Sequence, residues 1–149
     1  FGENYFFVNG SLNRKRLAEL VFQDVQALQK LNAITHPAII ARCEELAQTY
    51  LQKEPQGIVI MEAALLIEAD MLPLVNSLLL VTADEEVRLA RIQKRDKLSA
   101  AEAAARIESQ MSEDVKRAYA DYIVENNTNE QAFYEGLDAF WQKINAANK

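Results

Sequence analysis

Residues 58–62 read Ile58-Val59-Ile60-Met61-Glu62, four apolar side chains followed by a carboxylate. A short apolar run with β-branched residues, entered from Pro55-Gln56-Gly57, predicts a strand over 58–61 that is buried on both faces. A carboxylate is costly there unless it is paired or lies at the strand's carboxyl end, where ligands bind in open α/β sheets. Glu62 therefore has the position of an acid that helps to hold Mg²⁺ beside a nucleotide. The alternative is an acid that favours the first turn of a following helix.

The composition of the chain excludes several classes of protein. Its 149 residues are 50% hydrophobic, which is enough for one domain with a core and too apolar for a disordered chain. The net charge of −6 argues against general nucleic-acid binding. No apolar stretch approaches the roughly 18 residues that a membrane-spanning helix needs. The single Cys43 excludes an internal disulfide, so we expect a packed thiol and a cytoplasmic location.

The spacing of apolar residues predicts strands that alternate with helices. Strands are predicted over 58–61, 77–81 and 122–124, and residues 63–72 form a short helix or loop before Pro73. Helices are predicted over 13–22, 37–55, 85–95, 99–111, 112–120 and 130–144. Such alternation is typical of an α/β fold with a parallel sheet.

Three local signals refine these helices. Pro37 is expected to interrupt the helical pattern before it and to begin a new helix. Ser99 with Glu102 predicts a capping box. The aromatic side chains of the last helix, Phe133, Phe140 and Trp141 among them, are expected in the core.

Arg88, Arg91 and Arg95 are spaced i, i+3 and i+7 on one predicted helix, so they share a face. Arginine suits phosphate, because its planar fork donates paired hydrogen bonds and stays charged. Positioned arginines stabilise the charge that spreads over oxygens during phosphoryl transfer. The alternative is a solvated face paired with nearby acids such as Asp96.

Arg106 and Gln110 are spaced i, i+4 on an alanine-rich helix between Ser99 and Ser112. Such a helix is either a mobile lid that closes over phosphates or a plain surface helix. His36 is the only histidine, and beside Pro37 it is expected to make a structural hydrogen bond rather than to catalyse. With no second histidine or cysteine at ligand spacing, the sequence predicts no zinc site.

Six segments, taken in order to about Phe133, resemble dephospho-coenzyme A kinases, a family of P-loop kinases. The matching segments are Asn9-Gly10-Ser11-Leu12-Asn13-Arg14, Leu31–Pro37 with its His-Pro pair, Glu62-Ala63-Ala64-Leu65-Leu66-Ile67-Glu68, Arg91 with Arg95-Asp96, Gln110, and Ala120-Asp121-Tyr122-Ile123-Val124-Glu125-Asn126-Asn127. Ala64 and Thr128 depart from the family's usual Pro and Gly. The sequence also contains no G-x-x-x-x-G-K-[ST] phosphate loop.

The resemblance implies a helix-rich, P-loop kinase-like α/β fold with a parallel sheet and flanking helices. In this interpretation the 149 residues are a single domain that lacks the family's first strand and phosphate loop. Residues 9–57 form a helical region on the coenzyme A side. Residues 58–95 and 120–149 form the core, and residues 96–119 form the lid.

The reaction implied is transfer of the γ-phosphate of ATP to the ribose 3′-hydroxyl of dephospho-CoA, the last step of coenzyme A biosynthesis. Glu62 and Arg95 would be catalytic, Glu62 by holding Mg²⁺ through water. ATP would meet Arg91, Arg95, Arg106, Asn126 and Asn127. Dephospho-CoA would meet Arg14, His36, Leu65, Leu66 and Glu68.

The missing phosphate loop leads to two further expectations. The chain alone should have no appreciable kinase activity, because that loop supplies backbone N–H groups and a lysine to the ATP phosphates. The gap in the sheet should close by direct pairing of 58–61 with 77–81, or be filled by a second copy through oligomerisation or strand exchange. Two alternatives stay open: another P-loop small-molecule or nucleoside kinase, and a non-catalytic helical interaction module.

Overall fold

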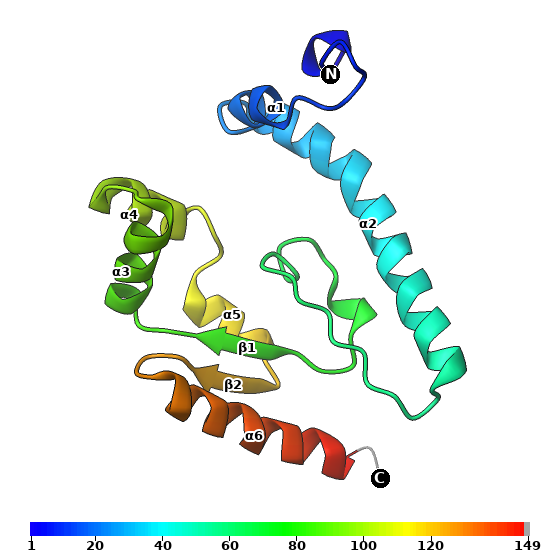
Figure 1. Cartoon of the computed structure of the whole chain (residues 1–149), viewed down its shortest axis with the longest axis vertical. Coiled ribbons are helices and arrows are strands. Elements are labelled where there is room, and N and C mark those ends of the chain that lie inside the picture. Colours follow the sequence, from blue (N-terminus) through cyan, green and yellow to red (C-terminus); the bar gives the residue numbers. More distant parts are fainter. Residues whose placement is uncertain (148–149) are drawn as a thin grey trace. The chain divides into compact units, whose positions relative to one another are not determined.

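The chain divides into two compact units, Phe1–Lys53 and Glu54–Lys149. The computed structural model describes residues 1–147 (Figure 1). The N-terminal unit contains a short 3₁₀ turn, η1 (Glu3–Tyr5), and two helices, α1 (Arg14–Val21) and α2 (Val25–Lys53). Its small core consists of Leu17, Val21 and Ala27, with Phe1, Tyr5, Leu20 and Leu31 packed against them.

Side-chain caps explain where the two N-terminal helices begin. The side chain of Asn13 accepts a hydrogen bond from the backbone N–H of Arg16 (3.1 Å) and so caps α1. The Asp24 carboxylate accepts from the N–H groups of Gln26 (2.8 Å) and Ala27 (3.1 Å) at the start of α2. Asp24 therefore caps α2 in the same way.

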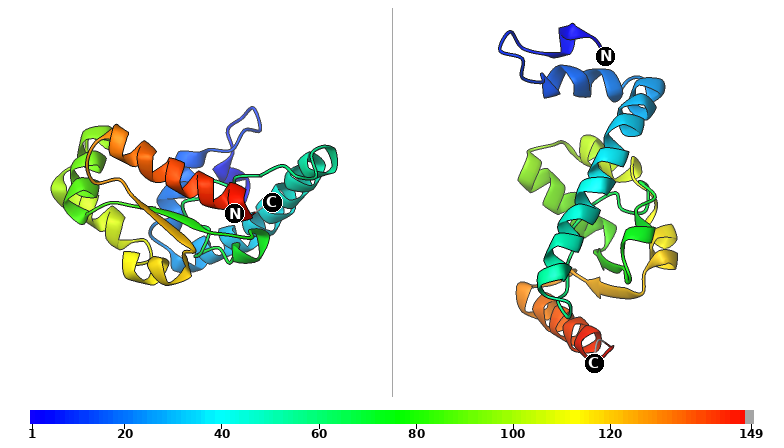
Figure 2. Two further views of the ribbon diagram at one scale, coloured as in Figure 1. Left: turned by 90° about the horizontal axis from the view of Figure 1, so that it is seen from below. Right: turned by 90° about the vertical axis from the view of Figure 1, so that its right-hand side faces the viewer.

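The predicted break at Pro37 is wrong, because α2 is a single helix of 29 residues that contains this proline. Figure 2 shows α2 as one uninterrupted helix. A proline inside a helix removes one backbone hydrogen bond and costs about 3 kcal/mol or more. The intact turns on both sides keep α2 continuous, so Pro37 is accommodated rather than used as a boundary.

The C-terminal unit is built on two parallel strands, β1 (Leu79–Thr82) and β2 (Tyr122–Glu125). A 3₁₀ turn, η2 (Leu72–Leu74), precedes β1. The crossover from β1 to β2 contains α3 (Glu85–Asp96), α4 (Ala100–Glu108) and α5 (Glu113–Tyr119), and α6 (Glu130–Ala147) follows β2 (Figure 1). The strands predicted over 77–81 and 122–124 and the helices after them are therefore confirmed.

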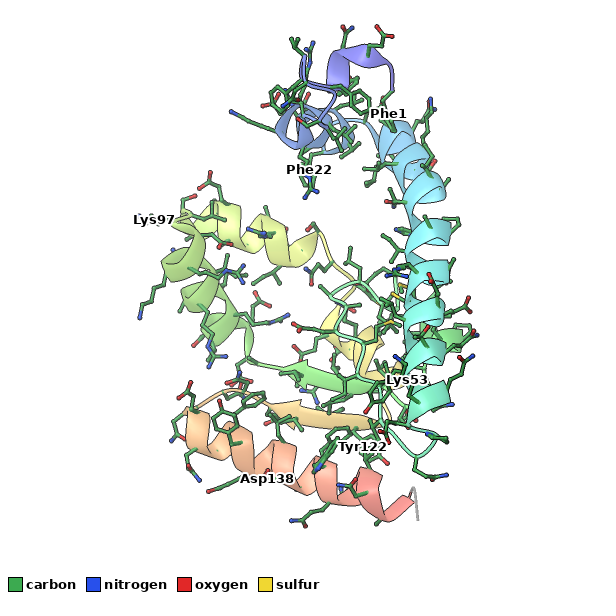
Figure 3. The ribbon with its side chains drawn as sticks, turned by 45° about the vertical axis from the view of Figure 1, so that its right-hand side comes forward. Phe1, Phe22, Lys53, Lys97, Tyr122 and Asp138 are labelled. Atoms are coloured by element: carbon green, nitrogen blue, oxygen red, sulfur yellow. The ribbon has the colours of Figure 1, made fainter. Side chains whose placement is uncertain are left out.

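The strand register assigns the two faces of this sheet. Leu79 pairs with Tyr122 and Val81 with Val124, so these four side chains share one face. The ring of Tyr122 lies edge-on to that of Phe140 at 5.1 Å between centroids, between β2 and α6 (Figure 3). Val124 lies against Gly136 of α6. The core role predicted for Phe140 is thus supported, whereas Trp141 is 43% exposed.

The strand predicted over 58–61 is wrong. Among the described residues β1 pairs only with β2, and residues 58–61 have no ladder partner. A strand exists only where a neighbour takes its backbone hydrogen bonds, and without one Ile60 is left 76% exposed. Direct pairing of 58–61 with 77–81, the first way of closing the gap, is therefore wrong as well.

Candidate active site

The carboxyl ends of β1 and β2 are joined by a pair of side chains. Asp84 precedes α3 at the N-cap position, but its carboxylate does not cap that helix. It accepts instead from the side-chain amide of Asn127 (3.1 Å), while the backbone N–H of Asp84 donates to the Asn127 oxygen (2.7 Å). This reciprocal pair ties the start of α3 to the residues that follow β2.

Arg91 makes a second contact between α3 and the end of β2. Its Nη1 donates to the backbone oxygen of Asn126 (2.7 Å) and its Nη2 donates to the side-chain oxygen of the same residue (3.1 Å). The structure thus brings together three of the predicted ATP-binding residues, Arg91, Asn126 and Asn127, at the sheet edge where ligands bind in α/β folds.

Asp96 holds the other two predicted arginines. Arg95 donates to it through Nε (2.7 Å) and Nη2 (2.9 Å), and Arg106 donates through Nη1 (2.7 Å). The hydrogen bonds from Arg95, followed by the charges of Arg95 and Arg106, keep the pKa of Asp96 below its ordinary value despite some burial. The two arginine side chains stay 69% and 55% exposed. One acid therefore holds two accessible guanidinium groups side by side.

The turn between α3 and α4 shapes this cluster. Lys97 ends α3 in the left-handed region (φ 56°), and Figure 3 marks it at the turn. The predicted capping box then begins α4: Ser99 Oγ accepts from the Glu102 N–H (3.3 Å), and Glu102 accepts from the Ser99 N–H (2.8 Å). Ala103 is fully buried. The predicted lid, residues 96–119, begins at this turn and contains α4 and α5, and its role as a lid stays a prediction.

Arg88 has a different partner from the two arginines that follow it on α3. Its Nη2 lies 3.5 Å from Oε2 of Glu113 on α5, and its Nε is buried without a hydrogen-bond partner within residues 1–147. The three arginines therefore contact three different partners. Their spacing places all three on one face of α3, but each long side chain turns toward the acceptor that its own turn of the helix reaches.

Glu113 forms an ionic cluster that the sequence analysis missed. The Thr82 hydroxyl donates to its carboxylate, and Arg117 donates through Nε (3.1 Å) and Nη2 (2.9 Å). Burial raises the pKa of Glu113, but the hydrogen bonds from Thr82 and Arg117 and the charges of Arg88 and Arg117 outweigh it and lower the pKa overall. The i, i+4 spacing of Glu113 and Arg117 was the available signal.

Residues 65–71 form a closed turn rather than a regular helix. The N–H of Met71 donates to the Leu66 oxygen (3.0 Å), and that of Asp70, which has a φ of 54°, donates to the Ile67 oxygen (3.1 Å). This pair of bonds around a left-handed residue is a Schellman motif. Leu66 and Met71 are both buried, whereas Leu65 is 50% exposed. Of the two predicted leucines, Leu65 is the accessible one.

Glu68 lies in the middle of this turn and pairs with α5. Its Oε1 accepts from Nζ of Lys116 (3.0 Å) and from the backbone N–H of Met111 (3.3 Å). Burial raises the pKa of Glu68, but hydrogen bonds from its own backbone N–H, Lys116 and Met111, with the Lys116 charge, leave it below its ordinary value. Lys116 was not predicted as a functional residue.

The remaining predicted residues stand apart from these contacts. Glu62 is exposed and makes no hydrogen bond or ion pair within residues 1–147. Arg14 begins α1 as an exposed residue, and His36 lies half-buried in the middle of α2. Both belong to the N-terminal unit, and their predicted contact with dephospho-CoA stays a prediction.

Residues 1–147 contain no cluster of three or more His, Cys, Asp or Glu side chains placed to bind a metal ion. Mg²⁺, however, is commonly held by one or two carboxylates together with water and substrate phosphates. An exposed, unengaged acid such as Glu62 fits that requirement. No helix of the described residues is long and apolar enough to cross a membrane.

Comparison with known proteins identifies the family. The family model for dephospho-CoA kinase matches residues 1–132. The chain belongs to the dephospho-CoA kinase family. It is 36% identical over 144 residues to the dephospho-CoA kinase of Moorella thermoacetica, covering 97% of this chain and 68% of that protein. It is 41% identical over 127 residues to that of Dehalococcoides mccartyi, covering 85% of this chain and 64% of the relative.

Solved structures show the same relationship. The dephospho-CoA kinase from Campylobacter jejuni has a TM-score of 0.66 and 28% identity over 99% of this chain and 72% of that chain. The crystal structure of TT1252 from Thermus thermophilus has a TM-score of 0.69 and 30% identity, covering 93% and 71%. The predicted α/β, P-loop kinase-like fold class is thereby confirmed, and the two alternative functions are not favoured.

Proposed function

We propose that this chain supplies the lid and the acceptor-side loop for the ATP-dependent phosphorylation of the 3′-hydroxyl of dephospho-CoA. The observation that supports this most directly is that Arg95 and Arg106 both donate hydrogen bonds to Asp96. The chain that contains this cluster belongs to the dephospho-CoA kinase family. Two adjacent, exposed guanidinium groups are suited to a polyphosphate. A single acid between them leaves the group of three with an excess positive charge.

The hydrogen bonds of the three arginines support different roles for them. Arg95 uses Nε and Nη2 on Asp96, which leaves Nη1 for a ligand. Arg106 uses only Nη1, which leaves Nη2 and Nε. Arg91 has both terminal nitrogens on Asn126. Arg95 and Arg106 are therefore assigned to the ATP phosphates, and Arg91 is assigned to positioning α3 against Asn126.

These arginines would act mainly by electrostatics. Phosphoryl transfer spreads negative charge over the oxygens of the transferred group, and donors fixed in advance stabilise that charge without reorganising. Asp96 fixes them, because its two oxygens hold both guanidinium planes before a ligand arrives. Mg²⁺ bound at Glu62 would neutralise part of the phosphate charge. Asn126 and Asn127 would border the adenine.

On the acceptor side, Leu65 and Glu68 would contact dephospho-CoA, with Leu66 supporting the turn from inside. Arg14 and His36 would contribute from the helical region of residues 9–57. Low turnover by the 149 residues alone, assembly with a second copy and a cytoplasmic setting stay predictions.

Equilibrium binding tests this proposal without depending on turnover. We expect the purified chain to bind dephospho-CoA at least tenfold more tightly than AMP or UMP in calorimetric titrations. Tighter binding of a nucleoside monophosphate would instead favour another kinase of the P-loop class. Binding of neither acceptor would overturn the proposal.

Two variants test the assignment of Arg95 and Arg106 to the ATP phosphates. Loss of one hydrogen bond to a charged phosphate costs about 1.5–3 kcal/mol, so Arg95→Gln and Arg106→Gln should each weaken ATP binding by roughly tenfold or more. Arg42→Gln is the matched control, because Arg42 pairs with Glu45 within α2 and its side chain is 60% exposed. Equal affinity for ATP in the two lid variants and the control would contradict the assignment.

A further inference from the structure

Glu68 connects two segments that the proposed function uses separately. Its Oε1 is shared by Nζ of Lys116 (3.0 Å) and the backbone N–H of Met111 (3.3 Å). The same Nζ lies 3.5 Å from Oε1 of Gln110. Gln110 and Met111 belong to the connection that leaves α4 for α5 (Figure 1). The turn of residues 65–71 is therefore bonded through Glu68 to the segment between α4 and α5.

The lysine at this junction is held firmly on α5. Glu113, one turn earlier, binds Thr82 at the end of β1 and Arg88 near the start of α3. Arg117, the next residue after Lys116, lies 3.6 Å from Glu125 at the end of β2. Both ends of α5 are thus bonded to the sheet, so Lys116 is held in place beside Glu68.

Burial makes this junction sensitive to change. The side chains of Lys116 and Glu68 are only 14% and 22% exposed. Oε2 of Glu68 is buried and has no hydrogen-bond partner within residues 1–147. Removing the ammonium group would leave a largely buried carboxylate with backbone donors alone, an arrangement that proteins avoid by moving the acid toward water. Because the Schellman motif closes residues 65–71, such a movement would displace the turn as a unit.

We propose that Lys116 and Glu68 are positioning residues that couple the acceptor-side turn, residues 65–71, to the base of the lid at Gln110 and Met111. This inference rests on the proposed function, because it takes residues 65–68 as the acceptor side and α4 as the moving part of the lid. Occupation of the turn then changes the position of α4 through Glu68. The two substrates are linked by this pair of residues.

Amide hydrogen exchange with mass spectrometry tests the coupling first without any ligand. Lys116→Met should speed exchange about tenfold or more in both residues 65–71 and residues 100–111. Glu68→Gln, which keeps an acceptor for Met111, should act on the same two segments to a smaller extent. Lys143→Met is the matched control, since Lys143 is exposed on α6 and makes no ion pair within residues 1–147. Faster exchange confined to α5 in Lys116→Met would overturn the coupling.

Dephospho-CoA supplies the second arm of the experiment. In the wild-type chain it should slow exchange in residues 100–111, although it contacts residues 65–68. Lys116→Met should lose this slowing even when saturated with dephospho-CoA, and Lys116→Arg should restore it. Slowing that persists in Lys116→Met would refute the inference, since a merely structural lysine would leave it unchanged. Absence of binding to the wild-type chain would count against the proposed function, while the ligand-free comparison still decides the coupling.

Discussion

Gly136 is the position where a single methyl group should have the clearest effect on stability. A Cβ added there would lie 3.0 Å from Cγ1 of Val124, closer than the ~3.5–4.0 Å of an ordinary carbon–carbon contact. Val124 is buried, with 6% exposure, so it has little room to move. Alanine gains about 1 kcal/mol over glycine inside a helix, whereas overpacking a core costs about 1–3 kcal/mol. We therefore expect Gly136→Ala to destabilise the protein by about 1 kcal/mol.

A double-mutant cycle separates the two contributions. Val124→Ala removes the methyl groups that the new Cβ would meet, so in that background Gly136→Ala should stabilise by about 1 kcal/mol. The coupling between the two sites is then about 2 kcal/mol. Urea unfolding followed by the fluorescence of Trp141, which lies on α6, measures all four variants. A gain from Gly136→Ala in the wild-type background would refute the close packing of α6 on β2.

Two further predictions concern the lid and the ionic cluster. Lys97→Gly should stabilise the protein by about 0.5 kcal/mol. Glycine adopts the left-handed conformation (φ 56°) without the strain of a side chain, and this gain is partly offset because glycine loses more conformational freedom on folding. Lys97→Ala is the control, and equal urea midpoints for the two variants would contradict the prediction. The lowered pKa of Glu113 means that its contribution to stability is present above the unfolded-state pKa, near 4.5, and is lost as the pH falls through the lower folded-state pKa. Glu113→Gln should therefore lower stability at pH 7 and show a flatter loss between pH 7 and pH 3 than the wild type, as measured by urea midpoints; parallel curves would show that Glu113 is not the titrating group.

The parts of the fold that were predictable depend on short-range rules. Ser99 and Glu102 form their capping box because both partners lie within one turn of the same helix. The strands β1 and β2 were recognised from their own apolar runs, and they also find each other as partners. Residues 58–61 show the same pattern but have no neighbour among the described residues, and a local pattern contains no information about a neighbour.

The residues of the candidate site were predictable, but most of their contacts with one another were not. Arg91, Asn126 and Asn127 were chosen from the family resemblance, and the structure brings them together at one edge. Arg88 was assigned by helical spacing to the face of Arg91, but spacing says nothing of which acceptor a long side chain reaches. The ion pair of Lys116 with Glu68 was not predicted, because the two residues lie far apart in the sequence. A pair of that kind becomes visible only once the chain has folded.

The two asparagines after β2 also determine how precisely α3 is positioned. Asn127 fixes α3 at Asp84, and Asn126 fixes it at Arg91, about 10 Å further along the helix axis. The tip at Asp96 lies about 18 Å from the first fixed point. Because α3 is rigid and fixed at Asp84, a displacement of about 1 Å at Arg91 becomes a displacement of about 1.7 Å at Asp96, in proportion to the two distances along the helix axis. The accuracy with which α3 presents Arg95 therefore depends on the contact between Arg91 and Asn126, one helical turn earlier.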